Sequence, residues 1–336
     1  MQLTIREHTL RPRHAFTLSR ESIRAKRTVF VELAHEGLVG RGEGAPIARY
    51  GETAQSCRAA LERMRAAMPE DPVDLAALRP SLWRAAPRDY AARAAMDAAI
   101  MDWVGKAQGV PLYALWQIDP ARMPPTSMTI AIDAPDRVRE RAREAAGFRV
   151  LKLKVGVEQD RAMVDAIRDV TDVAIRADAN EGYPDRETAL REIEWLAGRG
   201  VELIEQPLPA ARLEDMVWLK ERSPLPLIAD EAYLQPEDAP ALAEAYHGVN
   251  VKLVKCGGIA TAREAIEIAR SCNLQVMIGC TIESSLGIAA AAHLAPLADY
   301  VDLDGNLLIE NDPFVGHPIQ DGRIRLRDTP GLGIER

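Results

Sequence analysis

The sequence predicts an α/β protein in which a separate α+β region precedes a barrel of parallel strands and helices. From Met128 onward, eight short runs rich in β-branched residues alternate with amphipathic helical stretches. This alternation is typical of parallel strands joined by crossover helices. Before Asp119, strand-like runs are instead followed by a group of helical stretches. Eight regularly spaced strands favour a closed (β/α) barrel over an open doubly wound sheet.

The barrel strands are short apolar runs, several of which end in polar residues. They are expected at 128–132, 150–155, 173–179, 201–206, 225–230, 249–254, 274–280 and 300–304. Helical patterns separate them, beginning with 135–146 and 160–170. Because catalytic groups of such barrels lie at the carboxyl ends of the strands, these ends are where functional residues are sought.

The N-terminal region has its own pattern. Strands are expected at 1–8, 16–19 and 28–33, and helices at 55–67, 75–82 and 90–108. The glycine-rich run Gly40–Gly44 lacks GxGxxG spacing, so we interpret it as a tight turn after a strand. A proline-rich boundary follows at 119–125, and a strand-like piece at 323–326 is expected to return to this region. The expected units are an α+β domain of residues 1–121, joined by 312–336, and a barrel of residues 122–311.

Composition excludes several classes of function. The net charge of −8 disfavours nucleic-acid binding as a general role. The start of the chain does not read as a secretory signal, and the apolar stretches are too short to span a bilayer. The four cysteines lack CxxC spacing and are expected to be reduced thiols. We therefore expect a cytoplasmic protein that does not bind membranes. A homo-oligomer is possible.

Three carboxylates end successive predicted strands: Asp178, Glu205 and Asp230. If they converge at separations of about 4 Å, each pair repels by roughly 4 kcal/mol at an effective dielectric near 20. A cation would relieve this repulsion, and an all-oxygen site without histidine suits Mg²⁺. The alternative is that each acid pairs with an arginine on an outer face of the barrel.

Lysines occupy the neighbouring strands. Lys152 and Lys154 share one strand face and lie near the expected cation. Their mutual repulsion and that cation should lower the pKa of at least one and allow general-base catalysis. Lys252 lies across the barrel, unless it forms a surface salt bridge. Lys255 lies three residues after Lys252, so strand alternation turns it to the opposite face, and it is expected outside the reaction centre. Alternation is also expected to turn Glu231 away from the axis.

Together these motifs resemble the muconate-lactonizing subgroup of the enolase superfamily. The matching segments are VLKLKVG (150–156), RADANEGY (176–183), LIEQPLP (203–209), ADEA (229–232) and VNVKLVKCGG (249–258). The N-terminal region resembles the capping domain of that superfamily, and GLGIE (331–335) its C-terminal return. The resemblance implies a modified (β/α)7β TIM-type barrel with an α+β capping domain formed by the N-terminal region and the C-terminal tail.

The same resemblance implies roles for individual residues. Lys154 and Lys252 would be acid/base groups on opposite faces of the substrate, in a superfamily that pairs such bases with Mg²⁺. Lys152 would help to hold the substrate carboxylate. The three carboxylates named above would bind Mg²⁺. Gly279-Cys280-Thr281 stands where the mandelate-racemase pattern has a histidine, which disfavours a lysine/histidine pair.

Asp302 and Asp304 discriminate between substrates. Spaced at i and i+2, they share a strand face and resemble a signature of dipeptide epimerases, in which both carboxylates hold the free ammonium of the dipeptide. The alternative is a helix cap plus a salt bridge. Thr129 is a candidate substrate contact, and Glu283 is a candidate support for the side of Lys252.

The loop 14–33 and the segment 49–52 resemble substrate-closing loops of L-Ala-D/L-Glu epimerases. Arg20 is the first candidate for binding a distal γ-carboxylate, and Arg24 is the second. The expected activity is Mg²⁺-dependent epimerisation of a dipeptide, most simply L-Ala-D/L-Glu, as in murein (peptidoglycan) peptide recycling. N-acylamino acid racemase, muconate-type cycloisomerase and o-succinylbenzoate synthase remain enzyme alternatives. An idle barrel that binds only metal or a small acid is the non-enzyme alternative.

Overall fold

The computed structural model describes residues 1–69 and 76–335. Its main element is a sheet of eight parallel strands whose spatial order follows their order in the chain. The first and last strands approach one another through a parallel bridge between Thr126 and Val301, and Ser127 N–H donates to Val301 O at 3.1 Å. The predicted barrel is therefore confirmed. The strands are β6 (Met128–Ile130), β7 (Val150–Lys154), β8 (Ala174–Asp178), β9 (Val201–Glu205), β10 (Leu227–Ala229), β11 (Gly248–Val251), β12 (Gln275–Gly279) and β13 (Tyr300–Asp302).

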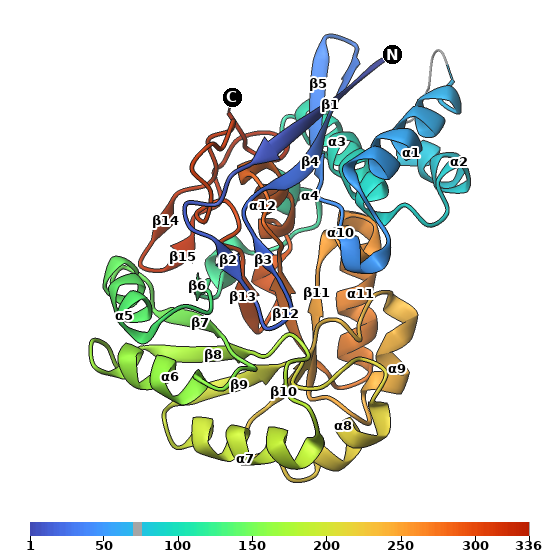
Figure 1. The fold of residues 1–336 in the computed structure, drawn as a ribbon. Helices are drawn as coiled ribbons and strands as arrows, with labels where there is room; N and C mark the ends of the chain where they lie inside the picture. Colours follow the sequence, from blue (N-terminus) through green and yellow to red (C-terminus); the bar gives the residue numbers. More distant parts are fainter. Residues whose placement is uncertain (70–75, 336) are drawn as a thin grey trace.

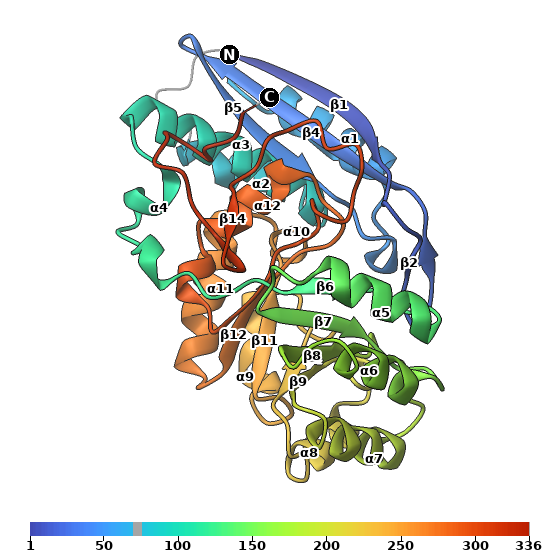
Figure 2. The same cartoon turned by 90° about the vertical axis from the view of Figure 1, so that its left-hand side faces the viewer.

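Helices cover the outside of this barrel, as Figures 1 and 2 show. They are α5 (Pro135–Glu144), α6 (Asp160–Arg168), α7 (Arg186–Ala197), α8 (Leu213–Lys220), α9 (Ala239–Leu242) and α11 (Ile259–Ser271). Two further helices pack against the N-terminal region: α10 (Leu253–Cys256) against α3 (Tyr90–Gln108) and α12 (Ser285–Ala292) against β5 (Leu38–Gly44). Leu151 and Leu153 of β7 join the large core cluster between strands and helices. Strand alternation then turns Lys152 and Lys154 toward the barrel axis. Among the described helices, none is long and apolar enough to cross a membrane.

The N-terminal region builds a three-stranded antiparallel sheet beside a group of helices, at the top of Figure 1. Its sheet order is β1-β4-β5, and a small hairpin of β2 and β3 extends from it toward the barrel. The elements are β1 (Gln2–Leu10), β2 (Phe16–Thr17), β3 (Ser22–Ile23), β4 (Lys26–His35), β5 (Leu38–Gly44), α1 (Ala54–Ala66), α2 (Arg79–Ala85), α3 (Tyr90–Gln108) and α4 (Leu112–Leu115). The expected helix at 75–82 begins outside the described residues. It is observed as a 3₁₀ turn, Ala76–Leu78, followed by α2.

The interpretation of Gly40–Gly44 as a turn is wrong, because these residues lie within strand β5. The hairpin turn lies earlier, at Glu36 and Gly37, whose φ angles are 48° and 77°. The glycines of β5 serve close packing against α3 instead. A Cβ atom on Gly42 would lie 1.9 Å from the carbonyl oxygen of Ala95, and one on Gly40 equally close to that of Ala99. Side chains at these positions would push the helix away from the sheet.

The C-terminal tail runs from the barrel back to the N-terminal region, as its red trace in Figure 2 shows. It forms a short hairpin of β14 (Ile319–Gln320) and β15 (Arg323–Ile324). Leu332 N–H then donates to Asp102 of α3 at 2.8 Å. On the other side, the β2–β3 hairpin contacts the barrel, where Ile132 N–H donates to Thr17 O at 3.0 Å. These contacts bring segments of the N-terminal region over one end of the barrel.

Candidate active site

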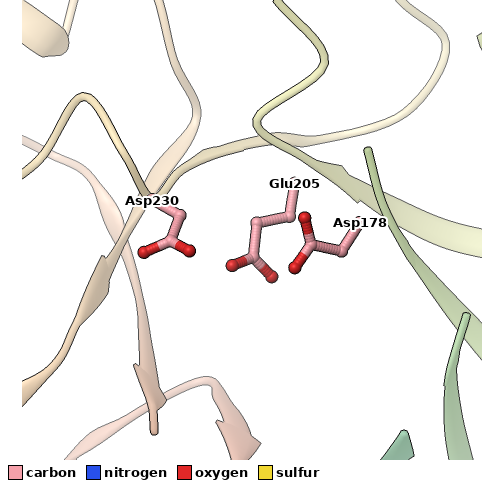
Figure 3. Close-up of side chains that lie close together, drawn as sticks. All are labelled: Asp178, Glu205 and Asp230. Carbon is pink, nitrogen blue, oxygen red and sulfur yellow. The ribbon is translucent and has the colours of Figure 1, made fainter. Parts of the chain in front are cut away.

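The three predicted carboxylates converge at the carboxyl ends of adjacent strands. Asp178 ends β8, Glu205 ends β9 and Asp230 follows β10. One oxygen atom from each lies within 4.8 Å of the others, and all three side chains are buried. Figure 3 shows them in a row, with Glu205 between the two aspartates. Their ion-pair partners are lysines inside the barrel rather than arginines on its outer face.

This cluster fits a hard divalent cation. Burial, reinforced by the charge of Asp178, raises the pKa of Glu205 to about 7, which reflects how costly three adjacent buried negative charges are. Asn250 Nδ2 donates to Glu205 Oε1 at 2.8 Å and so orients that carboxylate. The oxygen-only donor set is the type that Mg²⁺ prefers, with water and substrate oxygens completing its shell. The residues present therefore suit Mg²⁺ better than a softer metal.

The three lysines predicted for the site all contact the carboxylate row. Lys152 Nζ lies 3.0 Å from Asp178 Oδ2 and 2.7 Å from Glu205 Oε2. Lys154 Nζ lies 2.6 Å from Asp178 Oδ2, whereas Lys252 Nζ lies 2.8 Å from Asp230 Oδ2. Lys154 and Lys252 thus contact opposite ends of the row. Neither forms the surface salt bridge that was the alternative for Lys252, since both amines face the barrel interior.

We expected a lowered pKa for Lys152 or Lys154, but the pKa of Lys152 is raised. Burial acts to lower the pKa of Lys152, but the charges of Asp178, Asp302 and Glu205 outweigh it and raise that pKa well above its usual value. Likewise, burial opposes the charges of Asp230 and Glu205 at Lys252, and the pKa of Lys252 is raised. The expectation considered lysine–lysine repulsion and a bound cation, whereas carboxylates dominate when no cation is present.

Two expectations based on alternation were wrong. Lys255 lies at the site, with its Nζ 2.7 Å from Asp230 Oδ1, and burial lowers the pKa of Lys255. Strand β11 ends at Val251 and the short helix α10 follows, so strand parity no longer applies at Lys255. Glu231 is also buried and lines the site cavity, because the chain turns after β10. Gln206 fixes that turn by accepting from the backbone N–H groups of Asp230 and Ala232.

The two aspartates of the DxD pair both line the cavity but have different partners. Asp302 accepts from Lys152 Nζ and from Ser127 Oγ, each at 2.6 Å. Burial acts to raise the pKa of Asp302, but Lys152 and Ser127 hold it below its usual value. Asp304 accepts from Thr129 N–H at 2.6 Å, and burial raises the pKa of Asp304 to about 7. A cationic group beside Asp304 would favour its charged form.

The site lies in a cavity of about 540 Å³ between the barrel and the N-terminal region. Arg20 lines this cavity, and its Nη1 lies 2.7 Å from Glu231 Oε1. Arg24, the second candidate, is exposed and lies outside the cavity lining. Thr129 lines the cavity beside Asp304. The first arginine candidate is thus brought to the site, and the second is not.

Glu283 does not line the cavity and is buried together with a second acidic side chain, Glu43. Burial and the charge of Glu43 raise the pKa of Glu283 to about 8, which Lys26 and Lys252 partly offset. Glu43 comes from β5 and accepts from Ser284 N–H at 3.0 Å and from Gly287 N–H at 3.0 Å. This contact joins the N-terminal sheet to the start of α12.

Asn250 and Ser127 were not predicted as site residues, although their positions in the sequence carry a signal. Asn250 lies two residues before Lys252 and Ser127 two before Thr129, so period-2 alternation aims each at the barrel interior. Asn250 also depends on the glycine of the next strand. A Cβ atom on Gly279 would lie 2.5 Å from Asn250 Oδ1. Gly279 therefore leaves room for the side chain that orients Glu205.

Two family models match the chain. Residues 1–116 match "Mandelate racemase / muconate lactonizing enzyme, N-terminal domain", and residues 136–336 match "Enolase C-terminal domain-like". The chain is also 41% identical over 335 residues to the L-Ala-D/L-Glu epimerase of Bacteroides thetaiotaomicron, covering 99% of this chain and 88% of that protein.

Two solved structures are similar to the whole chain. The dipeptide epimerase of Enterococcus faecalis V583, complexed with Mg and L-Leu-L-Tyr, superposes with a TM-score of 0.92 at 32% identity. The similarity covers 100% of this chain and 99% of that one. The dipeptide epimerase of Methylococcus capsulatus, complexed with Mg and L-Arg-D-Lys, gives a TM-score of 0.89 at 35% identity, covering 99% and 98%. These relatives therefore bind dipeptides with quite different side chains.

Proposed function

Because the chain belongs to the mandelate racemase/muconate lactonizing enzyme family of the enolase superfamily, we propose that it is a Mg²⁺-dependent dipeptide epimerase. It inverts the α-carbon of the C-terminal residue by removing the α-proton from one face and adding a proton from the other. One observation carries this proposal. The carboxylate row has a lysine at each end, Lys154 and Lys252, and both of these lysines line the same cavity as Asp302 and Asp304. Relatives that are dipeptide epimerases support the assignment.

Asp178, Glu205 and Asp230 hold the cation. When bound, Mg²⁺ supplies positive charge that stabilises the substrate carboxylate as it becomes an enediolate. Lys152 contributes a second positive charge beside that carboxylate, since its Nζ already lies among the acidic groups. Lys154 and Lys252 act from opposite faces of the α-carbon. One amine removes the proton and the other ammonium returns one, so the centre inverts without any redox step.

Asp304 and Asp302 bind the free ammonium of the dipeptide in this proposal. Burial raises the pKa of Asp304 to about 7, so its carboxyl group is partly protonated near neutral pH. The approach of the substrate ammonium favours the ionised carboxylate, which then attracts the ammonium. Thr129 N–H orients the Asp304 carboxylate for this contact. An N-acylated amino acid has no such ammonium, which favours a dipeptide over an N-acylamino acid substrate.

For the substrate side chain, we propose L-Ala-D/L-Glu, with Arg20 binding the distal carboxylate. The 41% identical relative from B. thetaiotaomicron supports this choice. In the unliganded structure, Arg20 is paired with Glu231, so the γ-carboxylate would share or replace that partner. We propose a cytoplasmic location. All four cysteines are free thiols, which agrees with a reducing compartment.

The test is proton exchange in D₂O. The purified protein, Mg²⁺ and L-Ala-L-Glu are mixed, and the α-proton of the glutamate is followed by NMR. We expect deuterium at that carbon together with formation of the D-epimer. N-succinyl amino acids and muconate are run in parallel as substrates of the alternative activities. Absence of exchange with every member of a broad dipeptide library would overturn the proposal.

A further inference from the structure

Glu181 lies on a tight turn that directly follows β8. Asn180 and Glu181 have φ angles of 42° and 67°, so two consecutive residues other than glycine adopt the left-handed region. Contacts with the next strand hold this backbone in place, because Glu181 N–H donates to Gln206 O at 2.8 Å. Asn180 Nδ2 also donates to Glu231 Oε1 at 3.1 Å. The barrel thus fixes the direction in which the Glu181 side chain projects.

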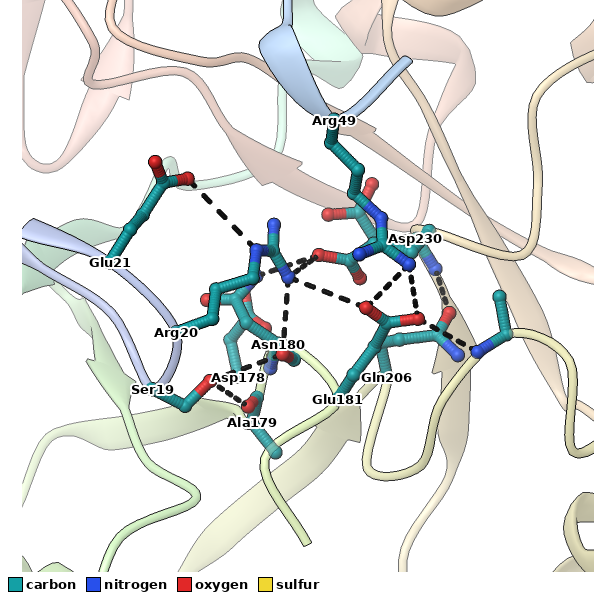
Figure 4. A network of polar contacts seen from close by, with 12 residues as sticks. Ser19, Arg20, Glu21, Arg49, Asp178, Ala179, Asn180, Glu181, Gln206 and Asp230 are labelled. Carbon is teal, nitrogen blue, oxygen red and sulfur yellow. Dashed lines mark hydrogen bonds and ion pairs between the residues drawn. The ribbon is translucent and has the colours of Figure 1, made fainter. Parts of the chain in front are cut away.

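The carboxylate of Glu181 contacts two segments of the N-terminal region at once (Figure 4). Arg49 Nη2 lies 2.6 Å from it, and Arg20 Nη1 lies 3.7 Å from its Oε2. Arg20 belongs to the loop between β2 and β3, whereas Arg49 belongs to a 3₁₀ turn, Ala48–Tyr50. A third donor is Ala210 N–H, at 2.8 Å from Oε1. One barrel carboxylate therefore joins both segments to the barrel.

Burial and position make this contact more than a surface ion pair. The Glu181 side chain is only 9% exposed, whereas Arg49 is 35% exposed. An acid screened from water in this way interacts more strongly with its partners than exposed pairs do. Both arginines also line the site cavity, so the segments that Glu181 contacts border the space in which we propose that the dipeptide binds.

We propose that Glu181 is a positioning residue that clamps the segment 18–25, which includes β3, and the segment 47–51 over the cavity. Glu181 does not touch the reacting atoms. The expected effect of Glu181 on substrate affinity rests on the proposed dipeptide epimerisation. The expected effect of Glu181 on the order of the two segments is independent of that function. A dipeptide binds under segments already held in place, so it loses less affinity to their ordering.

Glu181→Gln is the direct test, since an amide oxygen can still accept from Ala210 N–H while the ion pairs are lost. Glu192→Gln is the matched control. Glu192 also accepts from two arginines, Arg161 and Arg191, but it lies on the outer helix α7. Hydrogen exchange of the holoenzyme should accelerate about tenfold in both 18–25 and 47–51 for Glu181→Gln, and in neither for the control. No acceleration, or acceleration in one segment alone, would overturn the proposal.

Kinetics separate positioning from general destabilisation. For Glu181→Gln, the KM for the dipeptide should rise about fivefold to tenfold, while kcat and Mg²⁺ affinity stay within about twofold of wild type. A parallel loss of Mg²⁺ affinity and melting temperature would instead mean that Glu181 merely stabilises the turn. Should Glu181→Gln not fold, Arg49→Gln tests the same contact from the other side, and the exchange in 47–51 decides. If the wild-type protein turns over no dipeptide, the proposed function is wrong. The hydrogen-exchange rates of the two segments still test whether Glu181 holds them.

Discussion

Lys152 Nζ lies 2.6 Å from Asp302 Oδ2, so a residue proposed to hold the substrate carboxylate and one proposed to hold its ammonium bind each other in the unliganded structure. A dipeptide carries the same two charges at its two ends. Its binding would replace one internal ion pair by two contacts with the ligand. Asp304, which is not paired with Lys152 in this way, is then the more sensitive probe of the ammonium contact.

Replacing Asp304 by asparagine should weaken dipeptide turnover selectively. The asparagine amide oxygen can still accept from the ammonium, but the negative charge is lost, so kcat/KM for L-Ala-L-Glu should fall on the order of 10- to 100-fold. Steady-state kinetics with dipeptides checks this. The control is Asp299→Asn, because Asp299 pairs with Arg270 at the other end of the same strand. An unchanged kcat/KM for every dipeptide would contradict the ammonium role.

Mg²⁺ affinity should depend on pH near neutrality. Metal binding requires the carboxylate form, and burial with the charge of Asp178 raises the pKa of Glu205 to about 7. Protons therefore compete with the metal below that pH, and the Kd should rise up to about tenfold per pH unit. Calorimetric titration at pH 6, 7 and 8 measures the effect. Equal affinity at all three values would show that Glu205 is not protonated in the metal-free protein.

Glu283 should make the metal-free protein less stable as the pH rises. Burial and Glu43 raise its pKa from 4.5 to about 8, so the folded state binds the proton more tightly than the unfolded state does. Its contribution is most favourable at low pH and is lost as the pH rises toward 8. Between pH 6 and 8, wild type should lose about 2 kcal/mol of unfolding free energy relative to Glu283→Gln. Urea denaturation with EDTA measures both proteins, and parallel pH profiles would contradict the assignment.

Much of the fold and of the site could be predicted because the barrel follows simple periodicities. All eight strands lie where β-branched runs indicated them, and the carboxylates at 178, 205 and 230 follow from where strands end. Lys255 and Glu231 were misplaced because β10 and β11 are shorter than their apolar runs. Beyond a strand end, turn geometry rather than alternation decides the direction of a side chain.

Tertiary packing accounts for the other differences. Nothing local marks Gly40–Gly44 as a strand, because its glycines are required by the approach of α3, which is distant in sequence. The raised pKa of Lys152 arises from carboxylates on three other strands, which only the folded barrel brings together. The pairing of Arg20 with Glu231 joins residues 211 positions apart. Such contacts leave no periodic signal in the sequence.

Lys154 and Lys252 are proposed to reach one carbon from opposite faces, and single substitutions assayed in D₂O distinguish the two faces. Lys154→Ala and Lys252→Ala are each incubated with Mg²⁺ and with either epimer of the dipeptide. Each variant should lose epimerisation by a factor on the order of 10²–10⁴. Each should still exchange the α-proton of one epimer, and the two variants should act on opposite epimers. Exchange of the same epimer by both, or epimerisation by Lys154→Ala at the wild-type rate, would contradict the account.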